Sequence, residues 1–163
     1  MGVMMRHMKN AWKEIKLLVL DFDGVLTDGF VYVDQDGRES VRCSRRDGLG
    51  VGMLAERGIK TVVISKEQNG VVATRCQKLS IECFSGIDDK LGLLKKILDE
   101  KKIDPSDVCY VGDDVTDVDC IRHAGIGVAV ADAVPSAKGA ADLVTRAKGG
   151  DHAVREVCDL IIG

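Results

Sequence analysis

The fold is decided by residues 16–28, which read KLLVLDFDGVLTD. The apolar run at 17–20 predicts a buried strand, and Gly24 interrupts the pattern and allows a sharp turn. Ligands bind at the carboxyl ends of parallel strands, and strand residues two positions apart point the same way. Asp21 and Asp23 are therefore expected to direct two carboxylates into one place.

Two carboxylates this close together are unfavourable unless a cation neutralises them or one of them takes up a proton. Such a pair suits metal-assisted chemistry in which one carboxylate attacks and the other transfers protons. Asp-x-Asp-Gly also occurs in ordinary turns, where aspartate and glycine are favoured for backbone reasons. The pair alone is therefore compatible with a catalytic site and with an ordinary turn. The residues that follow the other predicted strands decide between the two.

The composition indicates one weakly acidic, cytoplasmic domain. The chain has 163 residues, and its net charge of −3 disfavours nucleic acid or an anionic membrane as the main partner. No apolar stretch approaches the roughly 18 residues that a membrane span needs. The six cysteines form no Cys-x-x-Cys pair, which favours reduced thiols over disulfides or a zinc site. We expect a flexible leader over residues 1–14 and a single domain over 15–163.

Strand and helix patterns alternate along the chain. Strands are predicted at 17–20, 59–64, 81–84, 108–111 and 127–130, and helices at about 47–58, 69–79, 88–98, 116–124, 134–140 and 151–162. Asp47 and Asp88 are the predicted caps of two of these helices. The alternation predicts a Rossmann-like three-layer α/β/α sandwich with a parallel central sheet. Residues 29–43, with an Asp-Gly turn, predict a protruding β-hairpin.

More polar residues follow the other predicted strands, namely Ser65, Lys90, Asp113, Asp114 and Asp117. Each has an ordinary explanation by itself, as a helix cap, a surface lysine or a turn. Together with the first two aspartates they place acids, a hydroxyl and a lysine at one edge of one sheet. Oxygen ligands suit Mg²⁺ bound with phosphate oxygens, and a hydroxyl and an ammonium suit a phosphoryl group. These parts describe phosphoryl transfer, in which positioning and charge stabilisation provide most of the catalysis.

The pattern resembles the haloacid dehalogenase superfamily of phosphohydrolases, whose four motifs find candidates in order from about residue 15 onward. The resemblance implies Asp21 as the nucleophile and Asp23 as the general acid/base, whose backbone carbonyl also binds the metal. It implies Ser65 as the phosphate-binding residue of the second motif. Lys90 fits the third motif, a lysine that holds the nucleophile and the phosphate.

The fourth motif of the superfamily matches Gly112-Asp113-Asp114-x-x-Asp117. The resemblance implies Asp113 as a metal ligand, alongside Asp21 and Asp23. It places Asp114 and Asp117 in or near the metal shell, behind the direct ligands. The implied cofactor is Mg²⁺.

Many members of the superfamily carry a cap domain, for which this chain has no room. The interval from Asp23 to Ser65 holds the hairpin and one helix, and the interval to Lys90 holds a helix and a short strand. An uncapped site serves either a large substrate or a subunit that covers its neighbour. The hairpin strands at 29–43 would have open edges in a monomer, which favours oligomerisation. The alternative is an edge blunted by its own charges, Asp34, Asp36 and Arg38.

Within the superfamily, the sequence resembles the capless subgroup that contains the 3-deoxy-D-manno-octulosonate 8-phosphate phosphatases. Residues 23–29 are similar to its extended first motif, and residues 46–50 and 149–156 are similar to its later blocks. The resemblance implies a homotetramer held by the hairpins, in which a neighbouring subunit completes each active site.

One departure concerns the residues after Ser65. The octulosonate enzymes usually have Gly-Arg there, whereas this chain has Lys66-Glu67. A glutamate followed by Arg75 and Lys78 resembles the branch acting on nine-carbon sugar acids such as 2-keto-3-deoxynononate 9-phosphate. The resemblance implies Glu67, Arg75 and Lys78 as candidate substrate-binding residues, and the alternative is that Arg75 and Lys78 are solvated helix positions.

The predicted function is therefore Mg²⁺-dependent phosphomonoester hydrolysis, through an aspartyl phosphate, of an eight- or nine-carbon 2-keto-3-deoxy sugar-acid phosphate. One alternative is a non-catalytic tetramerisation module, related to the C-terminal domain of acylneuraminate cytidylyltransferases. Another is a phosphoacceptor signalling domain. Against both, every catalytic position holds the residue that turnover requires, including Asp23 and Ser65.

Overall fold

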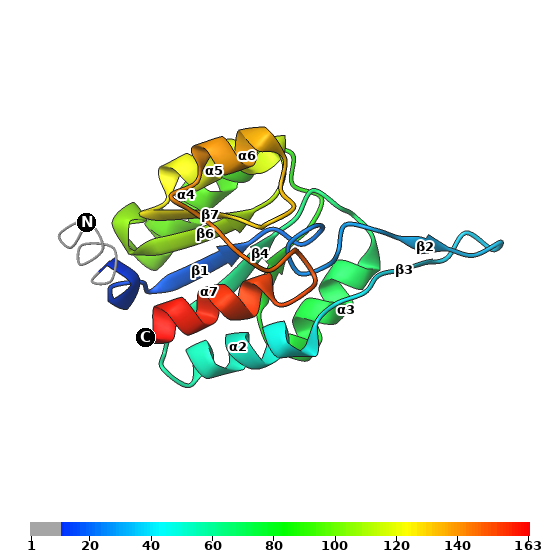
Figure 1. The fold of residues 1–163 in the computed structure, drawn as a ribbon, viewed down its shortest axis with the longest axis horizontal. Coiled ribbons are helices and arrows are strands. Elements are labelled where there is room, and N and C mark those ends of the chain that lie inside the picture. The colour runs from blue at the N-terminus through cyan, green and yellow to red at the C-terminus, as the bar shows by residue number, and fades with distance from the viewer. Residues whose placement is uncertain (1–10) are drawn as a thin grey trace.

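A six-stranded parallel sheet forms the centre of the protein in the computed structural model, which describes residues 11–163 (Figure 1). The strand order is β5-β4-β1-β6-β7-β8. The strands are β1 Leu17–Leu20, β4 Lys60–Ile64, β5 Glu82–Phe84, β6 Val108–Gly112, β7 Ile126–Ala129 and β8 Leu143–Val144. All four residues of β1 are fully buried between β4 and β6, as expected for a continuous apolar run in a parallel sheet.

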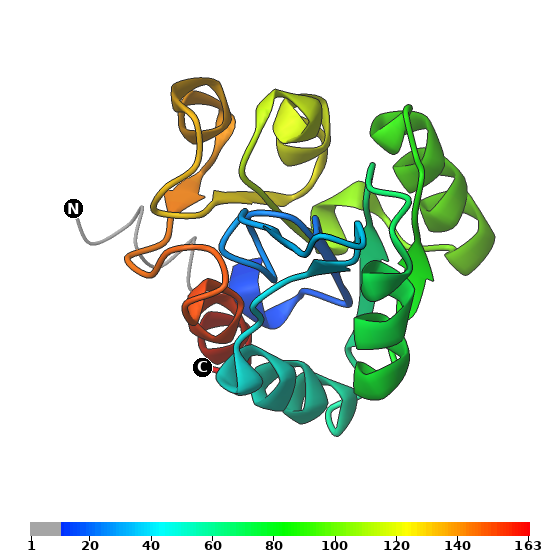
Figure 2. The same cartoon turned by 90° about the vertical axis from the view of Figure 1, so that its right-hand side faces the viewer.

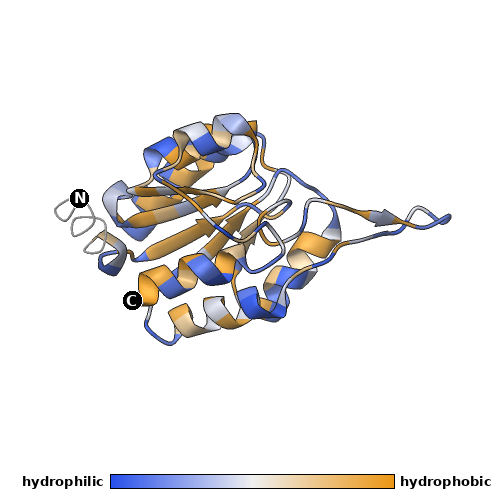
Figure 3. Ribbon diagram, viewed as in Figure 1, coloured by the Kyte–Doolittle hydropathy of each residue, from blue (hydrophilic) through white to orange (hydrophobic). Residues whose placement is uncertain are grey.

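Helices cover both faces of this sheet, which confirms the predicted three-layer sandwich (Figures 1 and 2). One face carries α2 Arg45–Ala55, α3 Gly70–Leu79 and α7 Ala153–Ile162, and the other carries α4 Lys90–Lys101, α5 Val118–His123 and α6 Pro135–Ala140. Two short 3₁₀ turns, η1 Pro105–Asp107 and η2 Val115–Asp117, flank β6. The hydrophobic colouring concentrates on the strands of the sheet, whereas the helices carry both hydrophobic and hydrophilic residues (Figure 3).

The strand order sets the position of the candidate site. From β1 the chain builds the sheet outward through β4 and β5, and it then returns to the other side of β1 through β6. The order therefore reverses between β1 and β6, and ligands of such sheets bind in the crevice at that reversal.

A two-stranded hairpin, β2 Tyr32–Val33 and β3 Glu39–Ser40, projects away from the sandwich (Figure 1). Its strands are only two residues long, shorter than predicted, because no layer packs on either face. The side chains of Phe30, Val31, Tyr32 and Val33 are exposed, between 51% and 72%. In this chain the hairpin therefore presents an unpartnered apolar surface.

Two predicted helix caps are wrong. Ser44 caps α2 by accepting hydrogen bonds from the backbone of Arg46 and Asp47, which places Asp47 inside the helix. Asp89 caps α4 in place of Asp88, by accepting a hydrogen bond from the Gly92 amide. In each case a nearby residue whose side chain is equally able to cap a helix stands where the backbone becomes helical.

The folded domain begins before residue 15. Trp12 and Ile15 are buried in the hydrophobic core, so residues 11–14 are not a loose leader. The rest of the predicted leader, residues 1–10, lies outside the described residues. The short strand β8 was not predicted, because two residues carry no usable periodicity. Across residues 11–163, no helix combines the length and apolar character needed to cross a membrane.

Candidate active site

The loop that follows β1, residues 21–29, turns sharply at Gly24 and is called the catalytic loop below. Gly24 has φ of +81°, a left-handed conformation that favours glycine. A Cβ atom at this position would also overlap the carboxylate of Asp113. The Thr27 hydroxyl fixes the turn by accepting hydrogen bonds from the amides of Gly24 and Gly29, both at 3.1 Å.

The catalytic loop forms one wall of a cavity of about 600 Å³ at the carboxyl edge of the sheet. The cavity brings together most of the predicted site residues, namely Asp21, Asp23, Ser65, Glu67, Lys90, Asp113 and Asp114. It also contains residues that the sequence did not predict as site residues, namely Gly29, Lys66, Gln68, Asp88 and Thr116. They lie in the loops that follow β1, β4, β5 and β6, and such a position by itself does not separate them from ordinary loop residues.

Two predicted substrate residues lie elsewhere. Arg75 and Lys78 line a separate hollow of about 180 Å³, together with Arg45, on the side of α2 and α3. The guanidinium of Arg75 donates a hydrogen bond of 3.0 Å to the Ser44 carbonyl. Neither side chain therefore shares a cavity with Asp21 and Asp23 of its own chain.

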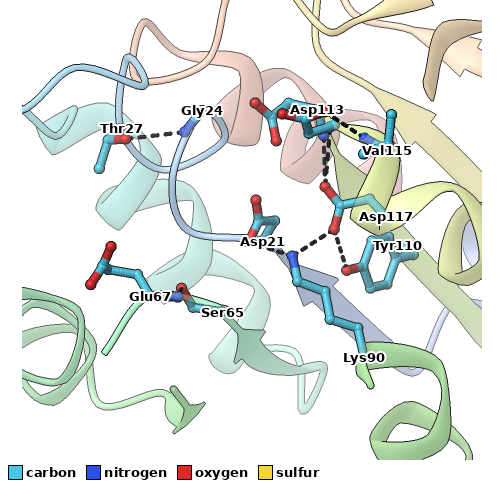
Figure 4. Close-up of polar contacts among 11 residues, drawn as sticks. Asp21, Gly24, Thr27, Ser65, Glu67, Lys90, Tyr110, Asp113, Val115 and Asp117 are labelled. Carbon is cyan, nitrogen blue, oxygen red and sulfur yellow. Dashed lines mark hydrogen bonds and ion pairs between the residues drawn. The ribbon is translucent and has the colours of Figure 1, made fainter. Parts of the chain in front are cut away.

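Lys90 occupies the centre of the polar network (Figure 4). Its side chain is 3% exposed, and its Nζ lies 2.8 Å from Asp21 Oδ1 and 2.8 Å from Asp117 Oδ1. Burial alone would lower the pKa of Lys90, but the two carboxylates together raise it, so the residue stays cationic. The ammonium therefore holds the Asp21 carboxylate in a fixed position at the cavity floor.

The buried Asp117 carboxylate fixes the network by accepting four hydrogen bonds. Its Oδ1 accepts hydrogen bonds from Lys90 and from the Tyr110 hydroxyl, each at 2.8 Å. Its Oδ2 accepts from the backbone amides of Asp113 and Asp114, at 3.1 and 3.3 Å. Four donors occupy this carboxylate, so it positions its neighbours and has no oxygen free for a further ligand.

Three carboxyl groups of the site, those of Asp21, Asp23 and Asp113, have pKa values above the usual range. Burial, followed by the charge of Asp117, raises the pKa of Asp21 to about 7. Burial, followed by the charge of Asp21, raises the pKa of Asp113 to about 8. Burial and then Glu67 raise the pKa of Asp23. This crowding of negative charge is relieved by a proton or a cation.

A divalent cation fits these residues. Among the described residues, carboxylate oxygens of Asp21, Asp113 and Asp117 lie within 4.8 Å of one another. Because the oxygens of Asp117 are already occupied, Asp21 and Asp113 offer the free donor atoms. An all-oxygen donor set with few protein ligands suits Mg²⁺, which keeps water and substrate oxygens in its shell.

Ser65 and Glu67 form the opposite wall of the cavity. The Ser65 hydroxyl accepts a hydrogen bond of 3.1 Å from the Glu67 amide. The Glu67 carboxylate accepts from the amides of Gln68 and Asn69, at 2.8 and 2.9 Å. The Asn69 side chain donates to Glu39 in strand β3 of the hairpin, at 2.9 Å. The hairpin and this wall are thereby linked.

Comparison with known proteins identifies the family. Residues 57–157 match the family of haloacid dehalogenase-like hydrolases. The 3-deoxy-D-manno-octulosonate 8-phosphate phosphatase of Salmonella typhi is 38% identical, over 99% of this chain and 86% of the relative.

Solved structures of related proteins have the same fold. The structure of the phosphatase of that name from Moraxella catarrhalis, in complex with magnesium, phosphate and KDO, is 34% identical. It has a TM-score of 0.93 over 97% of this chain and 91% of that one. The Yersinia pestis enzyme is 37% identical, with a TM-score of 0.92 over 95% and 84%. The chain therefore belongs to the haloacid dehalogenase-like hydrolases, as a homologue of the 3-deoxy-D-manno-octulosonate 8-phosphate phosphatases.

Proposed function

We propose that the protein is a Mg²⁺-dependent phosphatase that hydrolyses a phosphorylated 2-keto-3-deoxy sugar acid of eight or nine carbons. The observation that carries the proposal is the buried contact of 2.8 Å between Lys90 and Asp21, beside Asp113 in one open cavity. The names of the homologues support the sugar-acid class of substrate. Burying the charged groups of Lys90, Asp21 and Asp117 carries a desolvation cost. A non-catalytic tetramerisation module would have no function that compensates for this cost.

The proposed reaction has two steps. An Asp21 oxygen attacks phosphorus, the bond from phosphorus to the leaving oxygen breaks, and the Asp23 carboxylic acid donates its proton to that oxygen. The Asp23 carboxylate then takes a proton from water, whose oxygen attacks phosphorus. The bond from phosphorus to Asp21 breaks, which regenerates both carboxyl groups and releases phosphate. The raised pKa of Asp23 favours its acid role in the first step.

The other side chains hold the transferring group. Lys90 places a positive charge beside the nucleophile, and Ser65 offers a hydroxyl to a phosphoryl oxygen from the facing wall. Asp21, the backbone carbonyl of Asp23 and Asp113 would hold Mg²⁺, with Asp114 and Asp117 behind them. The bound ion would neutralise the crowded carboxylates and the charge that develops on the phosphoryl oxygens.

Metal-free protein is expected to lose stability as the pH rises. The folded-state pKa values of Asp21 and Asp113, about 7 and about 8, lie above the unfolded value of 3.8. The folded state therefore binds more protons between about pH 4 and pH 8, and the free energy of unfolding falls across that range. Mg²⁺ replaces those protons, so its stabilising effect should be larger at pH 8 than at pH 5.

The measurement is urea unfolding at pH 5 and pH 8, with excess EDTA or with Mg²⁺. The Mg²⁺ concentration is the same at both pH values, and at pH 8, where it is about 100 times the dissociation constant, the ion should add about 2.7 kcal/mol. Burial raises the pKa of Asp47 to about 6. Its contribution to stability is the same with EDTA and with Mg²⁺, so it cancels when the two are subtracted at one pH. A Mg²⁺ effect that is absent, or equal at the two pH values, would contradict the proposed metal site. Asp113→Asn should remove the effect.

The protein is further proposed to act as a homotetramer joined through the hairpin at 29–43. The exposed apolar side chains of the hairpin support this, since an isolated two-stranded ribbon needs a partner surface. An open cavity gains its specificity groups from a neighbour in such an assembly. Arg75 and Lys78 are two cations that lie outside their own chain's cavity, so they are available to a neighbouring one.

A substrate panel tests this assignment. We expect phosphorylated eight- and nine-carbon 2-keto-3-deoxy acids to have higher kcat/KM than hexose phosphates. The double variant Arg75→Ala/Lys78→Ala should raise KM for the preferred acid about 10- to 100-fold, from the loss of charge-assisted hydrogen bonds. The rate with 4-nitrophenyl phosphate should not change, and light scattering should give a tetramer for both proteins. A preference for hexose phosphates would show the sugar-acid assignment to be wrong.

A further inference from the structure

The segment between β8 and α7, residues 145–151, lies directly against the catalytic loop and is called the glycine brace below. The Gly150 amide donates a hydrogen bond of 3.0 Å to the Val25 carbonyl. A Cβ atom on Gly149 would overlap the carbonyl oxygen of Gly24, and one on Gly150 would overlap the amide nitrogen of Asp28. The two backbones thus approach as closely as glycine alone allows.

This contact places Gly24 between two fixed groups. The Asp113 carboxylate lies where a Gly24 Cβ would be, and Gly149 lies against the Gly24 carbonyl. A displacement of Gly149 therefore moves Gly24 relative to Asp113, one of the proposed metal ligands. The brace itself contributes no residue to the lining of the catalytic cavity.

Three side chains outside the cavity fix the brace by hydrogen bonds, two from neighbouring elements and one, Thr145, from the brace itself. The Glu156 carboxylate accepts hydrogen bonds from the amides of Arg146 and Ala147, at 3.0 to 3.1 Å. Asp132 accepts from the Gly149 amide at 2.9 Å. The Thr145 hydroxyl donates to the Ala147 carbonyl at 2.7 Å. These bonds fix both halves of the brace, although none of the three side chains touches the proposed ligands.

The far end of the brace is fixed by the helix that follows it. His152, the N-cap residue of α7, makes no side-chain capping hydrogen bond. Instead, the buried Asp47 of α2 accepts a hydrogen bond of 2.8 Å from the Arg155 amide in the first turn of α7. Asp47 therefore supplies from another helix the acceptor and the negative charge that a helix N-terminus favours.

We propose that the glycine brace, held by Glu156 and Asp47, is a positioning device that sets the distance between Gly24 and Asp113. This inference rests on the proposed function, because the brace would serve to keep the catalytic loop and the proposed metal ligand Asp113 at a fixed distance. Mutation of groups that orient metal ligands without binding the metal themselves typically lowers metal affinity or activity 10- to 100-fold. A small misplacement of reacting groups has an effect of similar size on kcat.

Gly149→Ala tests the contact directly. Gly149 does not have a positive φ, so alanine is permitted by its backbone and acts only through the overlap with Gly24. We expect kcat to fall about 100-fold with KM little changed, and Mg²⁺ affinity measured by titration calorimetry to fall at least about tenfold. Gly52→Ala is the matched control, since no atom lies within 4 Å of its added Cβ. It should keep wild-type kcat and Mg²⁺ affinity.

Glu156→Ala tests the same device without adding an atom to the contact. Residues 24–27 are buried, so their amides should exchange slowly in the wild type. We expect hydrogen exchange in a peptide covering 22–29 to accelerate about tenfold in this variant, together with the exchange of 145–151. Glu100→Ala removes an exposed glutamate of a surface pair and should change neither.

The outcomes separate the brace from the proposed function. Folded Gly149→Ala protein with wild-type Mg²⁺ affinity and kcat would overturn the proposal. So would Glu156→Ala exchange that accelerates in 145–151 but not in 22–29. If wild-type protein hydrolyses no phosphate ester, the proposed function fails, whereas the exchange measurement still decides whether the brace holds the loop.

Discussion

Replacing Asp21 with asparagine is expected to abolish phosphatase activity while the fold stays intact, with kcat lower by at least about 10⁴-fold. The amide keeps the shape of the side chain but cannot attack phosphorus. It also removes a buried negative charge whose pKa is raised to about 7, so the variant should be no less stable than the wild type at neutral pH. Lys90 keeps Asp117 as its partner, at 2.8 Å.

The measurement is the rate of phosphate release from a generic phosphate ester in saturating Mg²⁺, with circular dichroism as the check on folding. Asp119→Asn is the matched control, because Asp119 is exposed on α5 and does not line the cavity. Wild-type turnover in the Asp21 variant would exclude this carboxylate as the nucleophile.

Lys90→Met is expected to lower the free energy of unfolding by about 3–5 kcal/mol at pH 8, the usual effect of breaking a buried ion pair. The substitution leaves Asp21 and Asp117 without the cation that lies 2.8 Å from each of them. Activity should also be lost, because the positive charge beside the nucleophile disappears. No other described lysine reaches these two carboxylates, so no side chain replaces it.

The destabilisation should depend on pH in a defined direction. Without Lys90, burial raises the pKa of Asp21 still further above the unfolded value of 3.8. The folded state then gains stability by binding a proton at low pH and loses it as the pH rises. The difference between variant and wild type should therefore be smallest near pH 4 and largest near pH 8, in urea unfolding without metal. Lys96→Met, at an exposed lysine, is the control; an equal loss at both pH values would contradict the buried-pair account.

The sequence predicted most of the fold because the four central strands, β4, β1, β6 and β7, are almost completely buried. Continuous apolar runs such as 17–20 and 108–111 have few other interpretations when helical patterns separate them. Helix starts were harder. Ser44 and Asp47 are both good capping residues, and only the path of the chain entering α2 decides between them.

The site was predictable to the extent that it depends on strand ends. Asp21 and Asp113 follow neighbouring strands, so topology alone brings them together. The role of Asp47 was not predictable, since its partner Arg155 is distant in sequence and is brought close only by the packing of α2 on α7. The adjacent Gly149 and Gly150 were a visible signal, but a glycine pair does not say which backbone it approaches.

Trapping of the aspartyl phosphate tests the central claim most directly. Enzyme turning over its preferred sugar-acid phosphate with Mg²⁺ is quenched and treated with borohydride, which reduces an acyl phosphate to the alcohol, and the peptide containing residues 17–29 is sequenced by mass spectrometry. The account predicts homoserine at position 21, present only when both substrate and Mg²⁺ were supplied and absent in Asp21→Asn. Continued turnover with no modification at position 21, or modification of a different carboxylate, would contradict it.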